Sequence, residues 1–262
     1  MHKLKHQHLI LSTITAIVIT GGVAVAADGG FESMPSASGI PDAPLSGDLL
    51  MAECLARIPK EHITMNGWIM MRRPKGMDAK EFDFTADIEW GAEIPSAEYA
   101  VSNRGGNLIE TVSITRSPAG PEILRTTGPE KKASSAPEWN EKIQGTDVTW
   151  LDVSLGFLWW KNPKLAGEDE VKGRLCDVVE LEPPVKVPGC AKVRVWLDRE
   201  VKMLLQAAEI SADGRENRRL WVRSVKKMND RWMVRDIEVQ SRGTGHRTRI
   251  HVLNLDDPVA DK

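Results

Sequence analysis

Few side chains beyond the N-terminal segment have the types and spacing needed for acid–base or metal chemistry. Three histidines lie there, His62, His246 and His251, in charged, strand-like stretches. This setting favours exposed strand histidines over a metal site or a catalytic triad. The chain contains no nucleophile elbow, phosphate-binding loop, zinc-protease helix or Cys-x-x-Cys motif. We therefore predict no metal, no cofactor and no enzymatic activity.

Two carboxylates, Asp87 and Glu89, could form the acid–base pair of a hydrolase. They alternate with apolar residues along 82–90, and this alternation predicts a strand whose polar face carries both acids. Acids two residues apart on an outer strand face are usually surface charge. A hydrolase therefore has the least support among the functions considered.

The three cysteines are Cys54, Cys176 and Cys190. Cys176 and Cys190 flank Pro183-Pro184, and a hairpin centred on these prolines would place the two thiols on neighbouring strands. A disulfide there would stabilise the fold by roughly 3 kcal/mol on the loop-entropy estimate. Two unlinked cysteines acting as small hydrophobic residues explain the same pattern equally well.

Residues 1–26 have the features of a secretory signal peptide, which are early lysines, an apolar stretch from Leu9 to Val23 and the small residues Ala24-Val25-Ala26. We predict cleavage after Ala26 and export, the alternative being an uncleaved membrane anchor. The first cysteine is Cys54, so the lipobox of a lipid-anchored protein is missing. No later segment is apolar enough over a sufficient length to span a bilayer. Residues 27–45 are rich in Gly, Ser, Pro and Ala and are predicted to form a flexible lead-in.

The remaining chain is dominated by patterns typical of strands. A helix is predicted over 47–58, with Ser46 as its N-cap and Pro59 at its end. Alternation and turn residues then predict about ten strands. They are expected at 63–71, 82–90, 97–102, 107–115, 173–181, 190–198, 202–211, 217–227, 231–241 and 247–254.

Two turns allow the strand register to be predicted. Folding about Asp213-Gly214 pairs Leu205 with Val222 and Ala207 with Leu220, and folding about Asn229-Asp230 pairs Val222 with Ile237 and Leu220 with Val239. Because both turns direct the same residues inward, an antiparallel meander is predicted. The opposite face, with Arg219, Arg223 and Glu238, is expected to be solvated.

A different pattern fills the middle of the chain. Residues 128–145 are predicted to be a loop, and the next stretch places Val148, Leu151, Leu155 and Leu158 at helical spacing. Trp150, Phe157, Trp159 and Trp160 add apolar bulk on other faces of the same stretch. A helix that is apolar on most sides must be buried, so we expect it to pack on the apolar face of the sheet.

Composition and charge narrow the function further. The chain is 41% hydrophobic and 27% charged, which is typical of a globular protein. Its 35 basic and 37 acidic residues leave a formal charge of -2. This balance argues against nucleic-acid binding.

Several blocks together carry a resemblance. GTDVTWLDVSLGFLWW (145–160) is the most specific, followed by VKGRLCDVVELEPP (171–184), AKVRVWLDREVKMLLQAAEISADGR (191–215) and RWMVRDIEVQSRGTGHRTRI (231–250). With a signal peptide, a helix and Gly67-Trp68-Ile69 before them, they resemble the outer membrane lipoprotein-sorting proteins of the LolA-like superfamily. The resemblance covers about 46–254, which predicts a LolA-like domain at 46–256 and a tail at 257–262.

This resemblance implies a mainly β fold, in which a single curved antiparallel sheet forms a half-open barrel with short helices covering its concave face. LolA- and LolB-type carriers hold the acyl chains of lipoproteins in such a cavity, in the periplasm of Gram-negative cells. It also implies an inner-membrane transporter as donor, an outer-membrane acceptor, and lipoprotein acyl chains or phospholipid as cargo.

The residues expected to line the cavity are Trp68, Phe84, Trp90, Leu151, Leu155, Leu158, Trp159 and Trp160. For each tryptophan, plain core packing remains the alternative. A second reading of the whole chain is a lipid-free envelope assembly module that binds partners through an exposed sheet edge.

Overall fold

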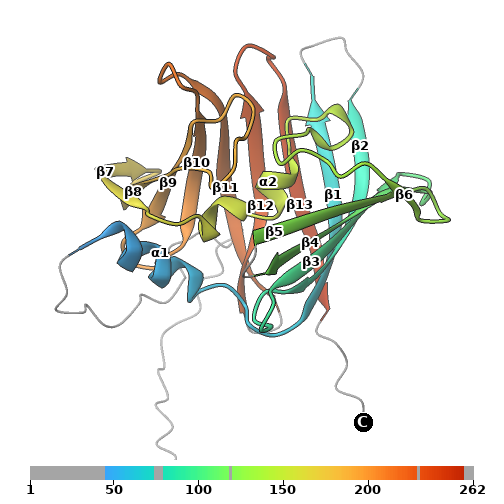
Figure 1. Ribbon diagram of the computed structural model, residues 1–262, viewed down its shortest axis with the longest axis horizontal. Coiled ribbons are helices and arrows are strands. Elements are labelled where there is room, and N and C mark those ends of the chain that lie inside the picture. The colour runs from blue at the N-terminus through green and yellow to red at the C-terminus, as the bar shows by residue number, and fades with distance from the viewer. Residues whose placement is uncertain (1–44, 74–78, 118–119, 229–230, 257–262) are drawn as a thin grey trace, which may run out of the picture.

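The computed structural model describes residues 45–73, 79–117, 120–228 and 231–256 (Figure 1). The predicted signal peptide 1–26, nearly all of the lead-in 27–45 and the tail 257–262 lie outside the described residues. Among the described residues, no helix has both the length and the apolar character needed to cross a membrane.

The described strands form one antiparallel sheet of thirteen, in the order β6-β5-β4-β3-β2-β1-β13-β12-β11-β10-β9-β8-β7. Because β6 and β7 end this order without pairing to each other, the sheet is not closed into a barrel. The strands are β1 Ile63–Arg72, β2 Lys80–Glu89, β3 Ser96–Asn103, β4 Leu108–Ser117, β5 Gly120–Thr127, β6 Lys132–Ser134, β7 Lys164–Val171, β8 Arg174–Leu181, β9 Lys192–Asp198, β10 Leu204–Ile210, β11 Glu216–Met228, β12 Arg231–Ser241 and β13 Arg247–Asp256. The predicted fold class, an unclosed and mainly β architecture, is confirmed.

The helices are short and lie on one side of the sheet (Figure 1). Helix α1 covers Gly47–Leu55, and the side chain of Ser46 caps it by accepting a hydrogen bond from the Leu49 amide at 3.2 Å. The other helical turns are α2 (Trp150–Val153) and the 3-10 turns η2 (Ile143–Gly145) and η3 (Gly156–Trp159). The predicted helix at 47–58 and its cap are therefore confirmed, with an earlier end.

The continuous helix predicted after residue 147 is wrong. Leu155 has φ 47°, in the left-handed region, and separates α2 from η3. Non-glycine residues rarely adopt this conformation, because the Cβ atom crowds the backbone. Local apolar spacing thus identified a buried segment but not its break.

Three strands have no counterpart in the prediction, β5, β6 and β7. They lie at or near the two ends of the sheet, where strands need no buried face. In β7, every residue except Val171 is exposed. Without an alternating apolar face, the periodicity that identified the other strands is missing. The predicted loop 128–145 contains β6 and η2.

The predicted register is confirmed for the central strands. Leu220 lies opposite Ala207 on β10 and Val239 on β12, and Val222 lies opposite Ile237. Leu205 is the exception, because the register shifts between Leu204 and Gln206. Leu205 therefore joins a second apolar cluster away from the main core, together with Val171, Cys176, Val178, Trp196, Ala208 and Ile210.

The face opposite the main core is less solvated than predicted. Arg219 stacks over the rings of Trp196 and Trp221, at 5.3 Å and 5.9 Å from guanidinium carbon to ring centroid. Arg223 stacks over Trp221 at 5.0 Å and pairs with Glu238. The aliphatic stems and planar heads of these arginines cover aromatic surface, which explains why tryptophans are tolerated there.

Of the two alternatives for Cys176 and Cys190, the structure has the unlinked one, with both cysteines free and buried. Cys176 lies opposite Asp198, whereas the β8–β9 pairing ends at Leu181 opposite Val193. Cys190 therefore lies beyond the far end of the pairing, in a bridge with Val187. The turn at Pro183-Pro184 does not set the register, because the connection continues to Val193. Burial raises the pKa of both thiols to about 12.

Candidate functional site

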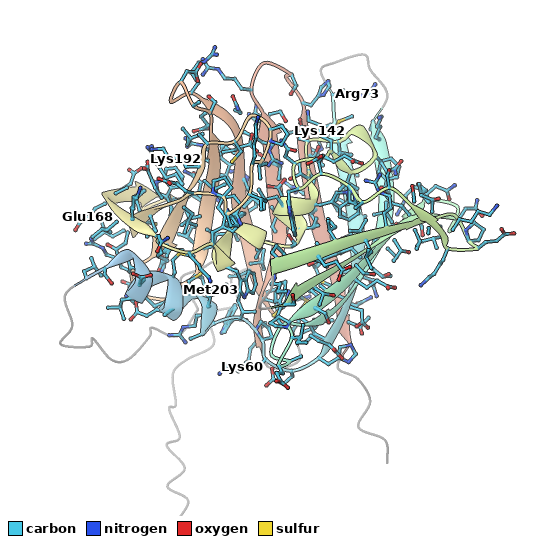
Figure 2. All side chains as sticks on the ribbon, in the orientation of Figure 1. Lys60, Arg73, Lys142, Glu168, Lys192 and Met203 are labelled. Atoms are coloured by element: carbon cyan, nitrogen blue, oxygen red, sulfur yellow. The ribbon has the colours of Figure 1, made fainter. Side chains whose placement is uncertain are left out.

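The main core encloses an apolar cavity of about 170 Å³ on the concave face. Strands β1, β2, β3, β11, β12 and β13 supply the wall, and α1, α2, η3 and the segment before β10 supply the cover. Met203, labelled in Figure 2, belongs to that last segment. The lining consists of Cys54, Arg57, Ile58, Pro59, Met65, Ile69, Phe84, Ala86, Ile88, Trp90, Tyr99, Val101, Ile143, Trp150, Val153, Leu155, Leu158, Met203, Leu204, Leu220, Val222, Trp232, Met233, Val234, Ile237, Ile250 and Val252.

Four of the eight residues proposed for the cavity line it, namely Phe84, Trp90, Leu155 and Leu158. Phe84 and Trp90 are on the same face of β2 and its extension, and Leu155 and Leu158 come from the cover. The left-handed conformation of Leu155 ends α2 and begins the 3-10 turn that carries Leu158. The break in the predicted helix thus lies within the cover itself.

The other four residues lie elsewhere. Leu151 is buried in the main core but outside the cavity lining, and Trp160 is partly buried against the core. Trp159 packs on Trp90 with ring centroids 5.8 Å apart, so it supports a lining residue without being one. Trp68 was wrongly expected to line the cavity.

Trp68 lies on the outer face, because inner-face residues of β1 alternate and include Gly67 and Ile69. Its ring stacks on His251 of β13 with centroids 4.8 Å apart.

Many lining residues were missed, and a large group of them comes from the C-terminal strands. Ile237, Ile250 and Val252 are inner-face positions of β12 and β13. The same alternation that predicted these strands could have identified them. Trp232 and Met233 are harder to find, because register shifts between Val222 and Val225 change which residues face inward.

One part of the cover is tied to the sheet by buried charges. Arg218 of β11 donates hydrogen bonds to Thr149 Oγ1 at 2.8 Å and Glu209 Oε2 at 3.0 Å, and forms an ion pair with Asp152. Burial by itself would lower the pKa of Arg218, but Asp152 and Glu209 raise it above its usual value. Asp152 also caps α2 by accepting from the Thr149 amide at 2.8 Å. The start of α2 is therefore anchored to β10 and β11.

A second anchor precedes α2. The Asp147 amide donates to Thr248 Oγ1 at 3.0 Å, and the Thr248 hydroxyl donates to Asp147 Oδ2 at 3.0 Å. Both residues are buried. In contrast, α1 is joined to the segment before β10 by the ion pair Lys202–Glu53 at 3.1 Å, with both side chains one-fifth exposed.

Some polar groups of the lining lack partners. The hydroxyl of Tyr99 and the indole nitrogens of Trp90 and Trp150 are buried without a hydrogen-bond partner among the described residues. Arg116 lies beside this region, with its guanidinium carbon 4.1 Å from the ring centroid of Trp159. Burial raises the pKa of Tyr99 and lowers the pKa of Arg116.

The groups considered for catalysis do not assemble a reactive site. Asp87 is half-exposed and accepts from His62 at 2.8 Å on the outer face. Asp236 accepts from the Ser224 hydroxyl at 2.5 Å and pairs with His251 at 2.8 Å, so the carboxylate separates the imidazole from the hydroxyl. His251 is thus packed and paired, contrary to the expectation of an exposed strand histidine. No cluster of metal-ligating side chains occurs within the described ranges.

Comparisons with known proteins place this geometry in a family. A family model described as an uncharacterized protein matches residues 129–262, slightly more than half of the chain. No curated protein matches the chain.

Three solved structures are similar over 82% of this chain. A DUF1329 family protein from Desulfovibrio piger has a TM-score of 0.70 and 15% identity, over 93% of its own chain. A LolA superfamily protein from Nitrosomonas europaea has a TM-score of 0.67 and 11% identity, over 94% of its chain. An outer membrane lipoprotein-sorting protein domain from Vibrio parahaemolyticus has a TM-score of 0.66 and 14% identity, over 92% of its chain.

At these identities the likeness concerns the fold, and it agrees with the unclosed sheet, the short covering helices and the apolar cavity. The chain belongs to the family whose model matches residues 129–262, and it has the LolA-like fold.

Proposed function

We propose that this protein is a periplasmic carrier that holds acyl chains of lipoproteins, or of other lipids, and transfers them toward the outer membrane. The observation that carries the proposal is the cavity on the concave face, whose lining is almost entirely aliphatic and aromatic. The fold shared with two similar structures, a LolA superfamily protein and an outer membrane lipoprotein-sorting protein domain, supports the same function. Donor and acceptor would be an inner-membrane transporter and an outer-membrane receptor.

The physical requirements of such a carrier are modest. Each methylene group that leaves water for an apolar cavity gains about 0.8 kcal/mol, so a short hydrocarbon segment is enough for useful affinity. Transfer to an acceptor with a better cavity needs neither a nucleophile nor a cofactor.

The volume of the cavity limits how much of an acyl chain it can hold. An engineered apolar cavity of about 150 Å³ holds a molecule of benzene, and the cavity here is about 170 Å³. It therefore accommodates a short hydrocarbon segment as it stands, and a whole acyl chain requires part of the cover to move. The buried anchors of α2 make α1 the part with fewer restraints.

A matched pair of variants on β2 tests the proposal. Ala86 is 1% exposed and lines the cavity, whereas its neighbour Thr85 is exposed on the outer face. Ala86→Phe should fill the cavity and weaken binding of a fluorescent fatty acid by about tenfold or more, which corresponds to the loss of about 1.4 kcal/mol. Thr85→Phe adds the same ring on the other face and should bind as the wild type does.

Lipid retained after expression gives an independent measurement. Native mass spectrometry of protein purified from a host with lipoproteins should show acyl-bearing adducts that Ala86→Phe loses. The proposal is wrong if the wild type carries no lipid and binds no fatty acid, or if Ala86→Phe binds like Thr85→Phe while remaining folded.

The alternative, a lipid-free envelope module that binds through a sheet edge, has weaker support. The exposed edge β7 carries Glu168, Asp169 and Glu170, and Figure 2 shows Glu168 projecting from that end of the sheet. The strand is also irregular between Leu165 and Gly167. Charges and irregularities of this kind discourage strand addition.

A further inference from the structure

The cavity wall contains hydrogen-bond donors that the rest of the chain does not satisfy. Tyr99 is 5% exposed, lines the cavity from the inner face of β3, and its hydroxyl has no partner among the described residues. Trp90 lines the same cavity, and its indole N–H is also buried without a partner among the described residues. A buried donor without an acceptor destabilises the protein, because it has lost its hydrogen bonds with water.

A positive charge lies next to these donors. Val112, Ile114 and Arg116 alternate along β4 and share its inner face, and Val112 lies opposite Tyr99. The guanidinium of Arg116 stacks on Trp159, whose ring packs in turn on Trp90. Its Nη2 donates to the carbonyl of Ser154 at 3.0 Å. Burial raises the pKa of Tyr99, and the positive charge of Arg116 acts in the opposite direction.

Arg116 differs from Arg218 in its electrostatic surroundings. Arg218 pairs with both Asp152 and Glu209, whereas no carboxylate of the described residues lies within 4.0 Å of Arg116. Removing a guanidinium from water without a counter-ion is unfavourable, and a bound anion would offset that penalty. Two neutral donors therefore belong to residues that line the cavity, and the cation Arg116 lies outside the lining, against Trp159, which packs on Trp90.

We propose that the cavity binds a fatty acid whose carboxylate accepts hydrogen bonds from Tyr99 and Trp90 and pairs with Arg116. The hydrocarbon chain lies among Phe84, Leu158 and Ile237. This inference rests on the proposed carrier function and narrows its cargo. The ester and amide carbonyls of a lipoprotein acyl group can accept from Tyr99 and Trp90, but they leave the charge of Arg116 uncompensated. A free carboxylate satisfies all three groups.

Two probes of equal chain length separate these chemistries, dodecanoate and methyl dodecanoate, with binding followed by calorimetry and by the fluorescence of the protein's tryptophans. We expect the wild type to bind dodecanoate at least ~10-fold more tightly than the ester, since hydrogen bonds to a charged group are about twice as strong as neutral ones. Arg116→Gln should remove this preference and change the affinity for the ester less than ~3-fold, because the ester carries no charge for Arg116 to pair with.

Arg242→Gln is the matched control. Arg242 is an exposed arginine in the β12–β13 turn, outside the cavity lining, and the same substitution there should leave the preference unchanged. Tyr99→Phe keeps the ring and removes the hydroxyl, so it should weaken binding of both probes by ~10-fold. Circular dichroism and thermal melting establish that each variant is folded.

The outcomes are distinguishable. Equal affinities for the two probes in the wild type, or a preference that survives Arg116→Gln, overturn the inference and leave acyl binding in place. If neither probe binds, the proposed function fails and the inference fails with it. If Arg116→Gln does not fold, the ratio of the two affinities in the wild type decides, because equal affinities overturn the inference and a preference of ~10-fold or more for dodecanoate supports it.

Discussion

Arg218 and Arg219 are consecutive residues of β11 whose side chains lie on opposite faces of the sheet. Arg218 is buried and neutralised by Asp152 and Glu209, while Arg219 is about one-third exposed and pairs with Glu216. The same residue type therefore serves two purposes. One arginine anchors the cover of the cavity, and the other shields outer tryptophans from water.

The first prediction follows from this contrast. Arg218→Met should lower the free energy of unfolding by about 3–5 kcal/mol, because Asp152 and Glu209 remain buried without a counter-charge. Urea denaturation followed by circular dichroism measures the change. Arg219→Met is the matched control and should lower stability by about 1 kcal/mol or less, as expected for a partly exposed pair. Equal effects of the two substitutions would show that Arg218 is no anchor.

Asp198 carries a second prediction at the residue scale. Burial would raise the pKa of this carboxyl, but hydrogen bonds from Arg174 and from the Val201 amide hold it below its usual range. Its pKa is therefore lower in the folded than in the unfolded chain, where it is about 3.9. The ionised carboxylate stabilises the fold above that value, and this contribution is lost as the pH falls through the folded pKa.

Melting temperatures recorded from pH 7 to pH 3 test this. The wild type should lose stability on acidification below about pH 4, and Asp198→Asn should start lower and lose less over the same interval. If the melting temperatures of the wild type and Asp198→Asn fall in parallel with pH, the prediction is wrong and other groups cause the acid sensitivity. Asp236, whose pKa is lowered by Ser224 and His251 against the effect of burial, would be the next to test.

Among the elements, β1 depends most visibly on a glycine. A Cβ atom at Gly67 would lie 2.0 Å from the carbonyl oxygen of His251 and 2.7 Å from the Phe84 ring. The register between β1 and β13 shifts at this point, between Asn66 and Gly67. The close approach of the two backbones at this bulge thus requires a residue without a side chain.

Gly67→Ala should therefore destabilise the protein by at least about 1–3 kcal/mol, the usual range for overpacking, because backbone atoms cannot move aside as a flexible side chain can. Chemical denaturation gives the value. Gly105→Ala is the control. Gly105 lies in the exposed β3–β4 turn, where the nearest atom to the new Cβ is the side-chain oxygen of Asn103 at 3.2 Å. That variant should stay within about 1 kcal/mol of the wild type; a similar loss in both would refute the close-approach explanation.

At the scale of the whole molecule, the two covering helices differ in their attachment. Helix α2 is held by buried charges and by the Asp147–Thr248 hydrogen bonds, whereas α1 is linked to the sheet side by Lys202–Glu53. Opening of the cavity should therefore begin at α1. In hydrogen–deuterium exchange, the amides of α1 should exchange faster than those of α2.

Glu53→Lys sharpens this prediction. The substitution turns the ion pair with Lys202 into a repulsion, so it should speed exchange in α1 and the association of a fluorescent fatty acid, with little effect on α2. Glu130→Lys makes the same charge change at an exposed site beside β6 and should alter neither rate. Faster exchange in α2 than in α1 would contradict the assignment of the moving part.

Much of this architecture follows from the sequence alone. Period-two alternation and turn residues predicted ten of the strands, the antiparallel C-terminal meander and the pairing of Leu220 with Ala207 and Val239. These features are predictable because a strand's side-chain period and a turn's backbone preference are local properties. Ser46 and Pro59 likewise determined the first helix. The apolar stretch after Asp147 showed that something buried would cover the sheet.

Tertiary structure decided the rest, and contacts between distant segments are the reason. A register shift directs Leu205 away from the cavity. The edge strand β7 has no alternating apolar face from which it could be predicted. The helical segment of the cover is interrupted at Leu155. The placement of Trp68 outside and of Arg116 beside Trp159 depends on how segments far apart in the chain curve and pack. Local periodicity records which residues share a face of one strand, but the side that encloses the cavity is decided only when the whole sheet curls around its covering helices.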